Sequence, residues 1–94
     1  MREPIQRHLW VTGRVQGVGF RAFVDREAQR IGGLKGWVRN LDDGRVEVLI
    51  SGVEAAVQEL VKQCAKGPAL GRVDRLEIRE EAATSDLPSF QIQK

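Results

Sequence analysis

A tight turn at Asp43-Gly44 divides this sequence into two halves that repeat the same order of apolar patterns. Asp-Gly between two alternating segments is a strong signal for a β-hairpin. In each half, a segment with the period-two alternation of a strand precedes a segment with helical spacing, and a second strand-like segment follows. We expect strands at residues 7–15, 35–40, 45–51 and 72–80, and helices at residues 20–31 and 53–66.

The two predicted helices each carry an apolar stripe and end at a glycine. The first begins at Phe20 and stops at Gly32-Gly33, and the second follows Gly52 and stops at Gly67-Pro68. Two β-α-β units joined by a hairpin predict an α+β fold of the ferredoxin-like split β-α-β type (β-α-β-β-α-β). We therefore expect one antiparallel sheet with both helices on one of its faces.

The last quarter of the chain departs from regular alternation in two places. The apolar positions change parity between Val73 and Leu76, which indicates a β-bulge near Asp74 or Arg75. Residues 82–89 are polar and are expected to form a loop, after which residues 90–92 alternate again and could pair as a short final strand.

The length of 94 residues fits a single domain over residues 1–94. A complete dinucleotide-binding fold or a (β/α)₈ barrel needs a longer chain. The 15 basic and 13 acidic residues nearly balance, but residues 1–47 hold nine basic against six acidic ones. The sequence lacks the dense Lys/Arg run that would indicate a nucleic-acid partner. A small anion bound by the first half of the chain is therefore the favoured ligand. Eleven of the basic residues are Arg, which suits forked recognition of phosphate or carboxylate.

The chain has one cysteine and one histidine, which limits the chemistry open to it. Cys64 has no partner for a disulfide or a cysteine zinc site, and its place on a helical apolar stripe predicts a core residue. We expect His8 on the surface of a strand, and Trp10 and Trp37 in structural roles. No apolar stretch resembles a signal peptide or a membrane helix, so we expect a cytoplasmic protein that is not bound to a membrane.

The loop before the first predicted helix is the most informative segment for function. Gly17 and Gly19 allow sharp backbone turns and the close approach of a ligand to backbone N–H groups. The loop leads into a helix N-terminus, where free N–H groups and the helix dipole favour an anion. Arg21 lies in the first turn of the predicted helix, where the positive end of the helix dipole disfavours a cation. A bound anion shared between the amides and Arg21 would remove that cost, so we expect a phosphate-type site here.

This loop fits neither of two common phosphate-binding motifs. The P-loop requires Gly-Lys-Ser/Thr at its end, whereas Phe20-Arg21 follows the last glycine here. Residues 17–22 match the dinucleotide pattern G-x-G-x-x-A, and Asp42 or Asp43 follows about 20 residues later. Those acids open a hairpin instead of ending a parallel strand, so the dinucleotide interpretation is rejected.

Two segments of the chain resemble the signatures of the acylphosphatase family. Residues 13–21 read Gly-Arg-Val-Gln-Gly-Val-Gly-Phe-Arg, and residues 36–40 read Gly-Trp-Val-Arg-Asn. The resemblance extends over nearly the whole chain, since it includes the length, the order of elements and the Asp43-Gly44 hairpin. It implies the ferredoxin-like fold and an enzyme that hydrolyses acyl phosphates to a carboxylate and inorganic phosphate, without a metal or cofactor.

The same resemblance implies roles for particular residues. Arg21 would grip the phosphoryl group and Asn40 would position the attacking water. The backbone of the glycine loop would cradle the phosphoryl oxygens through Gln16, Gly17, Val18, Gly19 and Phe20. Two interpretations remain open for Arg14 and Arg39. The favoured one is that both are solvated surface charges; the other is that they add to the positive potential of the site.

These residues suffice for the implied reaction because an acyl phosphate is already activated. The phosphoryl group passes through a loose transition state, so the protein must supply placement and charge stabilisation. We expect a monomer that acts on a small molecule and is inhibited by inorganic phosphate. The alternative is a phosphate- or RNA-binding module without turnover. RNA binding on this fold uses exposed aromatic side chains of the sheet, and the chain has no Tyr and no aromatic residue in residues 46–51.

Overall fold

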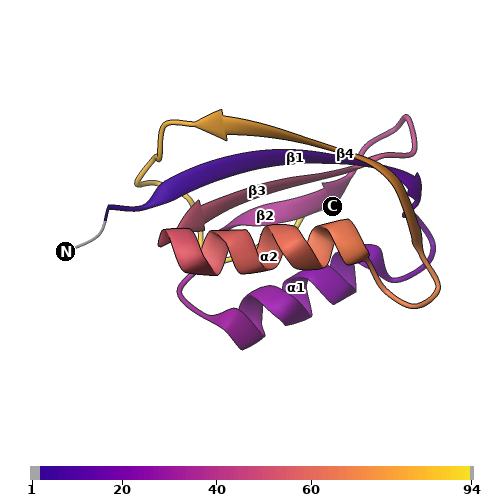
Figure 1. Cartoon of the computed structure of the whole chain (residues 1–94), viewed down its shortest axis with the longest axis horizontal. Helices are drawn as coiled ribbons and strands as arrows, with labels where there is room; N and C mark the ends of the chain where they lie inside the picture. The colour runs from indigo at the N-terminus through magenta and orange to yellow at the C-terminus, as the bar shows by residue number, and fades with distance from the viewer. Residues whose placement is uncertain (1–2, 94) are drawn as a thin grey trace.

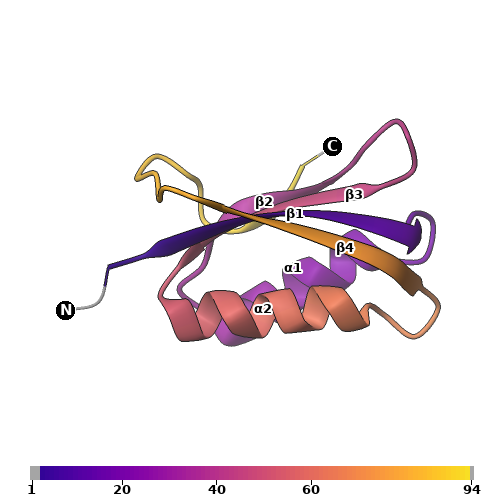
Figure 2. The same cartoon turned by 45° about the horizontal axis from the view of Figure 1, so that its top comes forward.

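The computed structural model describes residues 3–93 and confirms the predicted order of elements. The strands are β1 (Ile5–Arg14), β2 (Lys35–Asn40), β3 (Val46–Gly52), β4 (Arg72–Glu81) and β5 (Gln91–Ile92), and the helices are α1 (Phe20–Ile31) and α2 (Glu54–Lys66). They form one sheet in the order β4-β1-β3-β2-β5. Both helices pack on the same face of this sheet (Figures 1 and 2), which confirms the ferredoxin-like arrangement.

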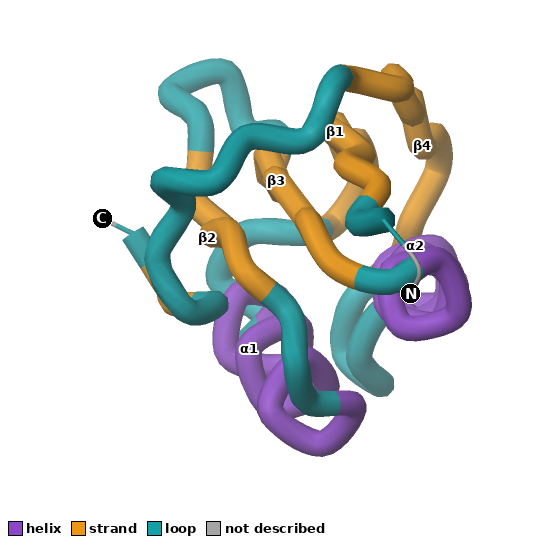
Figure 3. The backbone as a smooth tube through the Cα atoms, turned by 90° about the vertical axis from the view of Figure 1, so that its left-hand side faces the viewer, coloured by secondary structure: helices purple, strands orange, loops and turns teal. Residues whose placement is uncertain are grey.

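The sheet is mixed, whereas the sequence predicted an antiparallel one. The four long strands pair antiparallel, but β5 pairs parallel to β2 at the sheet edge, with Trp37 opposite Gln91 and Val38 opposite Ile92. The predicted loop after β4 explains this direction, since it crosses the end of the sheet before the chain turns back along β2 (Figure 3). The backbone N–H of Gly36 donates to Pro88 O at 2.9 Å, which fixes the loop beside β2.

A single apolar layer lies between the sheet and the two helices. Alternate apolar residues of the central strands are buried there, which agrees with the predicted alternation. Each helix contributes one face, on which the apolar residues recur every three or four positions. The buried side chains of this layer include Leu9 and Val11 of β1, Val38 of β2, Val46, Val48 and Ile50 of β3, Phe20, Val24 and Ala28 of α1, and Val57, Leu60 and Cys64 of α2. Of the helices in the described part of the chain, neither is long and apolar enough to cross a bilayer.

The predicted bulge is present where β4 pairs with β1. Thr12 lies opposite Arg75 and Gly13 opposite Val73, so Asp74 has no partner in the register. The extra residue restores the alternation of β4, so that Leu76 and Ile78 lie opposite Val11 and Leu9.

The central position of β3 brings the end of β1 and the end of β2 together. Both strands run antiparallel to β3, so they run in the same direction as each other. Val46 at the start of β3 pairs with Val11 on one side and with Asn40 on the other. The glycine loop that follows β1 therefore lies at the same end of the sheet as Asn40.

His8 is not the surface residue that the sequence predicted. Its side chain is only 13% exposed. It lies on the sheet face opposite the helices, where Nδ1 is 2.7 Å from Glu81 Oε2 and Nε2 is 2.6 Å from Glu47 Oε2. The prediction failed because β1 has a neighbouring strand on both sides, and side chains from β3 and β4 cover its outer face. Since both neighbours are carboxylates, only a doubly protonated ring donates to both.

The two tryptophans lie on the same open face of the sheet and are partly buried. Trp10 stacks on the His8 ring with the ring centroids 4.0 Å apart. The Arg79 guanidinium lies 5.2 Å from the Trp10 centroid, and Arg39 lies 4.7 Å from that of Trp37. The aromatic rings of this face are therefore stacked against cations of the chain itself, a structural role as predicted.

Candidate active site

The glycine loop between β1 and α1 is anchored at both ends by buried side chains. Val15 and Phe20 are each 1% exposed and pack into the apolar layer. Between them, Gly17 has a φ of 76° and Gly19 a φ of 80°. Side chains rarely adopt this left-handed conformation, so the backbone path of the loop requires glycine at these two positions. Gly17 and Gly19 place no side chain over the loop backbone, so a ligand can approach it there.

Several backbone N–H groups of this loop have no acceptor among residues 3–93. Helix α1 begins with a hydrogen bond from Phe23 N–H to Gly19 O at 2.9 Å. Its first turn has no acidic residue, and Gly19 offers no capping side chain. Within residues 3–93, the backbone N–H groups of residues 17–20 donate to no loop, turn or side-chain acceptor. Unpaired N–H groups at the positive end of a helix dipole favour an anion.

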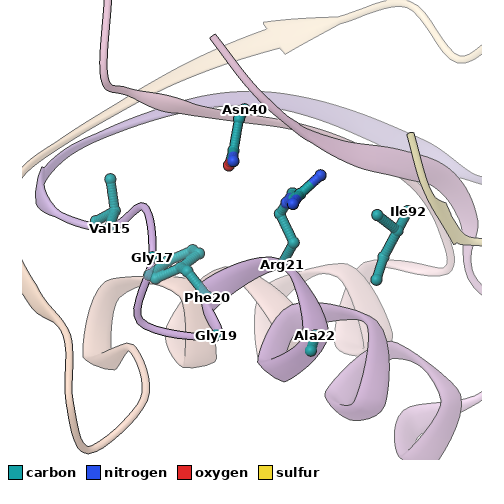
Figure 4. Close-up of a pocket in the computed structure, with 8 residues that line it drawn as sticks. All are labelled: Val15, Gly17, Gly19, Phe20, Arg21, Ala22, Asn40 and Ile92. Atoms are coloured by element: carbon teal, nitrogen blue, oxygen red, sulfur yellow. The ribbon is translucent and has the colours of Figure 1, made fainter. Parts of the chain in front are cut away.

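Arg21 extends from the first turn of α1 toward the end of β2 (Figure 4). Its Nη1 donates to the backbone oxygen of Gln93 at 3.4 Å, a long contact that leaves most of the five guanidinium N–H groups available. No carboxylate forms an ion pair with Arg21 in the described part of the chain. The guanidinium is therefore free to bind an anion in the loop.

Asn40 is the last residue of β2, and its amide points from the strand into the same space (Figure 4). Its Oδ1 is buried and has no hydrogen-bond partner in the described structure. A buried amide oxygen without a partner costs about 1–3 kcal/mol, so such an atom requires an explanation. A water molecule or a ligand that donates to Oδ1 would remove this cost.

These groups line one pocket of about 210 Å³. Arg21 and Asn40 are its only charged or side-chain-polar groups in the described residues, and the rest of its wall is glycine backbone and apolar side chains. The pocket is lined by Val15, Gly17, Gly19, Phe20, Arg21, Ala22, Asn40 and Ile92. The fold thus brings Arg21 and Asn40 together, although 18 residues separate them in the sequence.

Four other residues considered for the site are not among those that line the pocket. Val18 is partly buried against the core, and Gln16 directs its side chain to the turn after β2. Neither Arg14 nor Arg39 lines the pocket. Arg39 points to the open face of the sheet, where its Nε donates to Glu47 at 2.7 Å.

Sequence reasoning missed three residues that line the pocket. Ala22 follows Arg21 on the helix and Val15 precedes the loop, so both were adjacent to predicted residues. Ile92 comes from β5, whose placement beside β2 depends on the path of the preceding loop. No local pattern in the sequence indicates that path.

The remaining reactive side chains lie elsewhere. Cys64 is fully buried in the apolar layer, as predicted, and burial raises the pKa of its thiol to about 12. His8 lies on the open face of the sheet, with β1 and β3 between it and the helices. Across residues 3–93, no three His, Cys, Asp or Glu side chains are placed to hold a metal ion.

Known proteins of one family are similar to this chain. A family model described as acylphosphatase matches residues 7–92. This chain belongs to the acylphosphatase family. The enzyme hydrolyses acyl phosphates, so its substrate is a small molecule and one product is inorganic phosphate.

Individual acylphosphatases match nearly the whole chain. One from Koribacter versatilis is 51% identical over 87 residues, which cover 93% of this chain and 78% of the relative. One from Roseiflexus sp. is 42% identical and covers 98% of each chain. The crystal structure of acylphosphatase from Bacillus subtilis superposes with a TM-score of 0.89 at 41% identity, over 96% of this chain and 99% of that one.

Proposed function

We propose that this acylphosphatase binds the phosphoryl group of its substrate in the glycine loop, with Arg21 as the cationic partner and Asn40 as the group that positions water. The backbone N–H groups of residues 16–20 donate to the phosphoryl oxygens, and the guanidinium donates to them from the other side. Water attacks phosphorus, the bond between phosphorus and the carboxylate oxygen breaks, and the carboxylate leaves.

The unpartnered Oδ1 of Asn40 is the observation that carries this proposal. It faces the pocket that the glycine loop and Arg21 also line. A water that donates one hydrogen to Oδ1 keeps a lone pair for phosphorus, and the amide holds it without acting as a strong base. This satisfies the buried oxygen and orients the nucleophile with the same hydrogen bond.

The chemistry requires little beyond placement and charge. In a loose transition state, negative charge is spread over the phosphoryl oxygens, where fixed N–H groups and a guanidinium stabilise it most. A carboxylate is a good leaving group and needs no proton from the protein. Because Arg21 and Asn40 are the polar side chains of the pocket, the acyl group meets only apolar walls or solvent. We therefore expect the enzyme to accept several acyl groups.

The roles of Arg21 and Asn40 are tested by phosphate release from benzoyl phosphate in the presence of a chelator. Arg21→Ala and Asn40→Ala should each lower kcat/KM by at least about 100-fold, the size of effect seen when one transition-state donor is removed. Arg21→Ala should also weaken competitive inhibition by inorganic phosphate, because it removes the cation of the anion site.

Arg26→Ala and Asp42→Ala are the matched controls, since both side chains are exposed and neither lines the pocket. Both should retain wild-type kinetics. Full activity of either site variant, with the fold verified by circular dichroism, would refute the proposed roles.

We further propose that the enzyme acts as a monomer with one domain. Every residue that lines the pocket belongs to one chain, so the described site needs no second copy. The cytoplasmic location and the lack of a nucleic-acid partner predicted from the sequence stay predictions.

A further inference from the structure

The side chain of Gln16 connects the glycine loop to the turn that follows Asn40. Its Nε2 donates to Leu41 O at 2.8 Å and to Arg45 O at 2.9 Å. Residues 41–45 are the turn between β2 and β3, and Asn40 directly precedes them. One amide group therefore uses both of its N–H donors to join the phosphate-binding loop to the strand end that carries Asn40.

The turn does not depend on Gln16 for its own hydrogen bonds. Leu41 N–H donates to Arg45 O at 2.8 Å, and Gly44 N–H donates to Leu41 O at 3.2 Å. Both carbonyls that Gln16 contacts therefore keep a backbone donor when Gln16 is removed. The loop is likewise anchored by Val15 and Phe20 in the core. The Gln16 hydrogen bonds therefore add little to the stability of either the turn or the loop.

The two halves of the proposed chemistry lie on opposite sides of this bridge. The loop amides and Arg21 are carried by the segment from β1 to α1, and Asn40 is carried by β2. In the sheet, β3 lies between β1 and β2, so no strand pairing joins the loop directly to Asn40. Within residues 3–93, the two Gln16 hydrogen bonds are the side-chain hydrogen bonds that span this gap.

We propose that Gln16 is a positioning residue, which fixes the distance between the bound phosphoryl group and the water held by Asn40. This inference rests on the proposed roles of the loop and Asn40. Loss of the bridge should leave the loop able to bind phosphate, because the amides and Arg21 move together. It should impair attack, since misplacement by about 1 Å can cost about 100-fold in rate.

Gln16→Met tests the proposal because it keeps the length of the side chain and removes both donors. The kcat for benzoyl phosphate should fall by about 10- to 100-fold, while the inhibition constant of inorganic phosphate stays within about twofold of wild type. Gln58→Met is the control. That glutamine is exposed on α2 and donates a hydrogen bond to Glu54 on the same helix, so the variant should keep wild-type kinetics.

Gln16→Glu adds a readout that a merely structural role would not change. A carboxylate would face two carbonyl oxygens, whereas the protonated acid can donate to one of them. The ratio of the kcat of Gln16→Glu to that of wild type should therefore rise as the pH falls. In the wild type, nuclear magnetic resonance should show slow exchange of the Gln16 side-chain N–H protons, a measurement that needs no folded variant.

Three results would overturn the proposal: wild-type kcat in folded Gln16→Met, equal losses of kcat and phosphate affinity, or fast exchange of the Gln16 side-chain protons. Failure of the proposed function has a different signature. In that case Arg21→Ala and Asn40→Ala would retain activity in the same assay, whatever the result for Gln16.

Discussion

At the scale of single residues, the residue types of Gly17, Gly19 and Arg21 predicted an anion site, whereas the role of Asn40 depended on its signature context. Asn40 precedes a turn, where Asn is common for structural reasons, and only the match to a family signature gave it a role. Its buried, unpartnered oxygen adds a physical reason that the sequence did not contain. The Gln16 side chain was missed because its partners lie about 25 residues away, beyond any local pattern.

Cys64 illustrates a residue for which sequence reasoning was sufficient. Its place on the apolar stripe of α2 predicted a core residue, and the structure buries it completely. Because burial raises the pKa of the thiol to about 12, the reactive thiolate is rare at neutral pH.

Cys64→Ser should therefore leave kcat unchanged while lowering the free energy of unfolding by about 1–3 kcal/mol, since a hydroxyl replaces a thiol in an apolar site. Urea unfolding and initial rates measure the two effects. A folded Cys64→Ser variant with greatly reduced kcat would contradict the assignment of Cys64 to the core alone.

At the scale of helices and strands, the periodicity of apolar residues was enough to place both helices and the four long strands. The direction of β5 was not predictable, because two residues carry no periodicity and the path of residues 82–90 decides where they pair. His8 was assigned wrongly for a related reason. Alternation shows which face of β1 a residue is on, but not that Glu47 and Glu81 cover that face from the neighbouring strands.

The hydrogen bonds that Glu81 of β4 accepts predict a pH dependence of stability. Hydrogen bonds from Arg79 and then from His8, with a smaller one from Gln6, lower the pKa of Glu81 from its ordinary value of 4.5 to about 2. The folded protein therefore binds this proton less readily than the unfolded chain. The resulting stabilisation is fully present above about pH 5 and is lost as the pH falls toward 2.

Glu81→Gln should reduce the free energy of unfolding by about 1 kcal/mol at pH 6, the range of partly exposed ion pairs, and by less at pH 2.5. Glu80→Gln is the control. The Glu80 side chain is exposed, and its Oε2 lies 3.9 Å from Arg7 Nη2, so this ion pair should contribute little to stability. Urea titrations at both pH values measure the change. Equal losses for Glu81→Gln at pH 6 and pH 2.5 would contradict the predicted linkage.

At the scale of the whole molecule, the topology creates the site. Because β1 and β2 flank β3 and run in the same direction, the glycine loop and Asn40 meet at one end of the sheet. The sequence predicted both components, but their meeting was only implied by the family resemblance. The N-terminus of α1, the glycine loop, Arg21 and Asn40 then meet at one small pocket.

In the proposed mechanism, the loop holds the phosphoryl group while a water on Asn40 attacks phosphorus. Hydrolysis of benzoyl phosphate in water labelled with oxygen-18 tests this directly by mass spectrometry of both products. The label should enter inorganic phosphate, and benzoate should remain unlabelled, after correction for the reaction without enzyme. Label in the benzoate would mean that water attacks the acyl carbon, and it would contradict the proposed arrangement of the site.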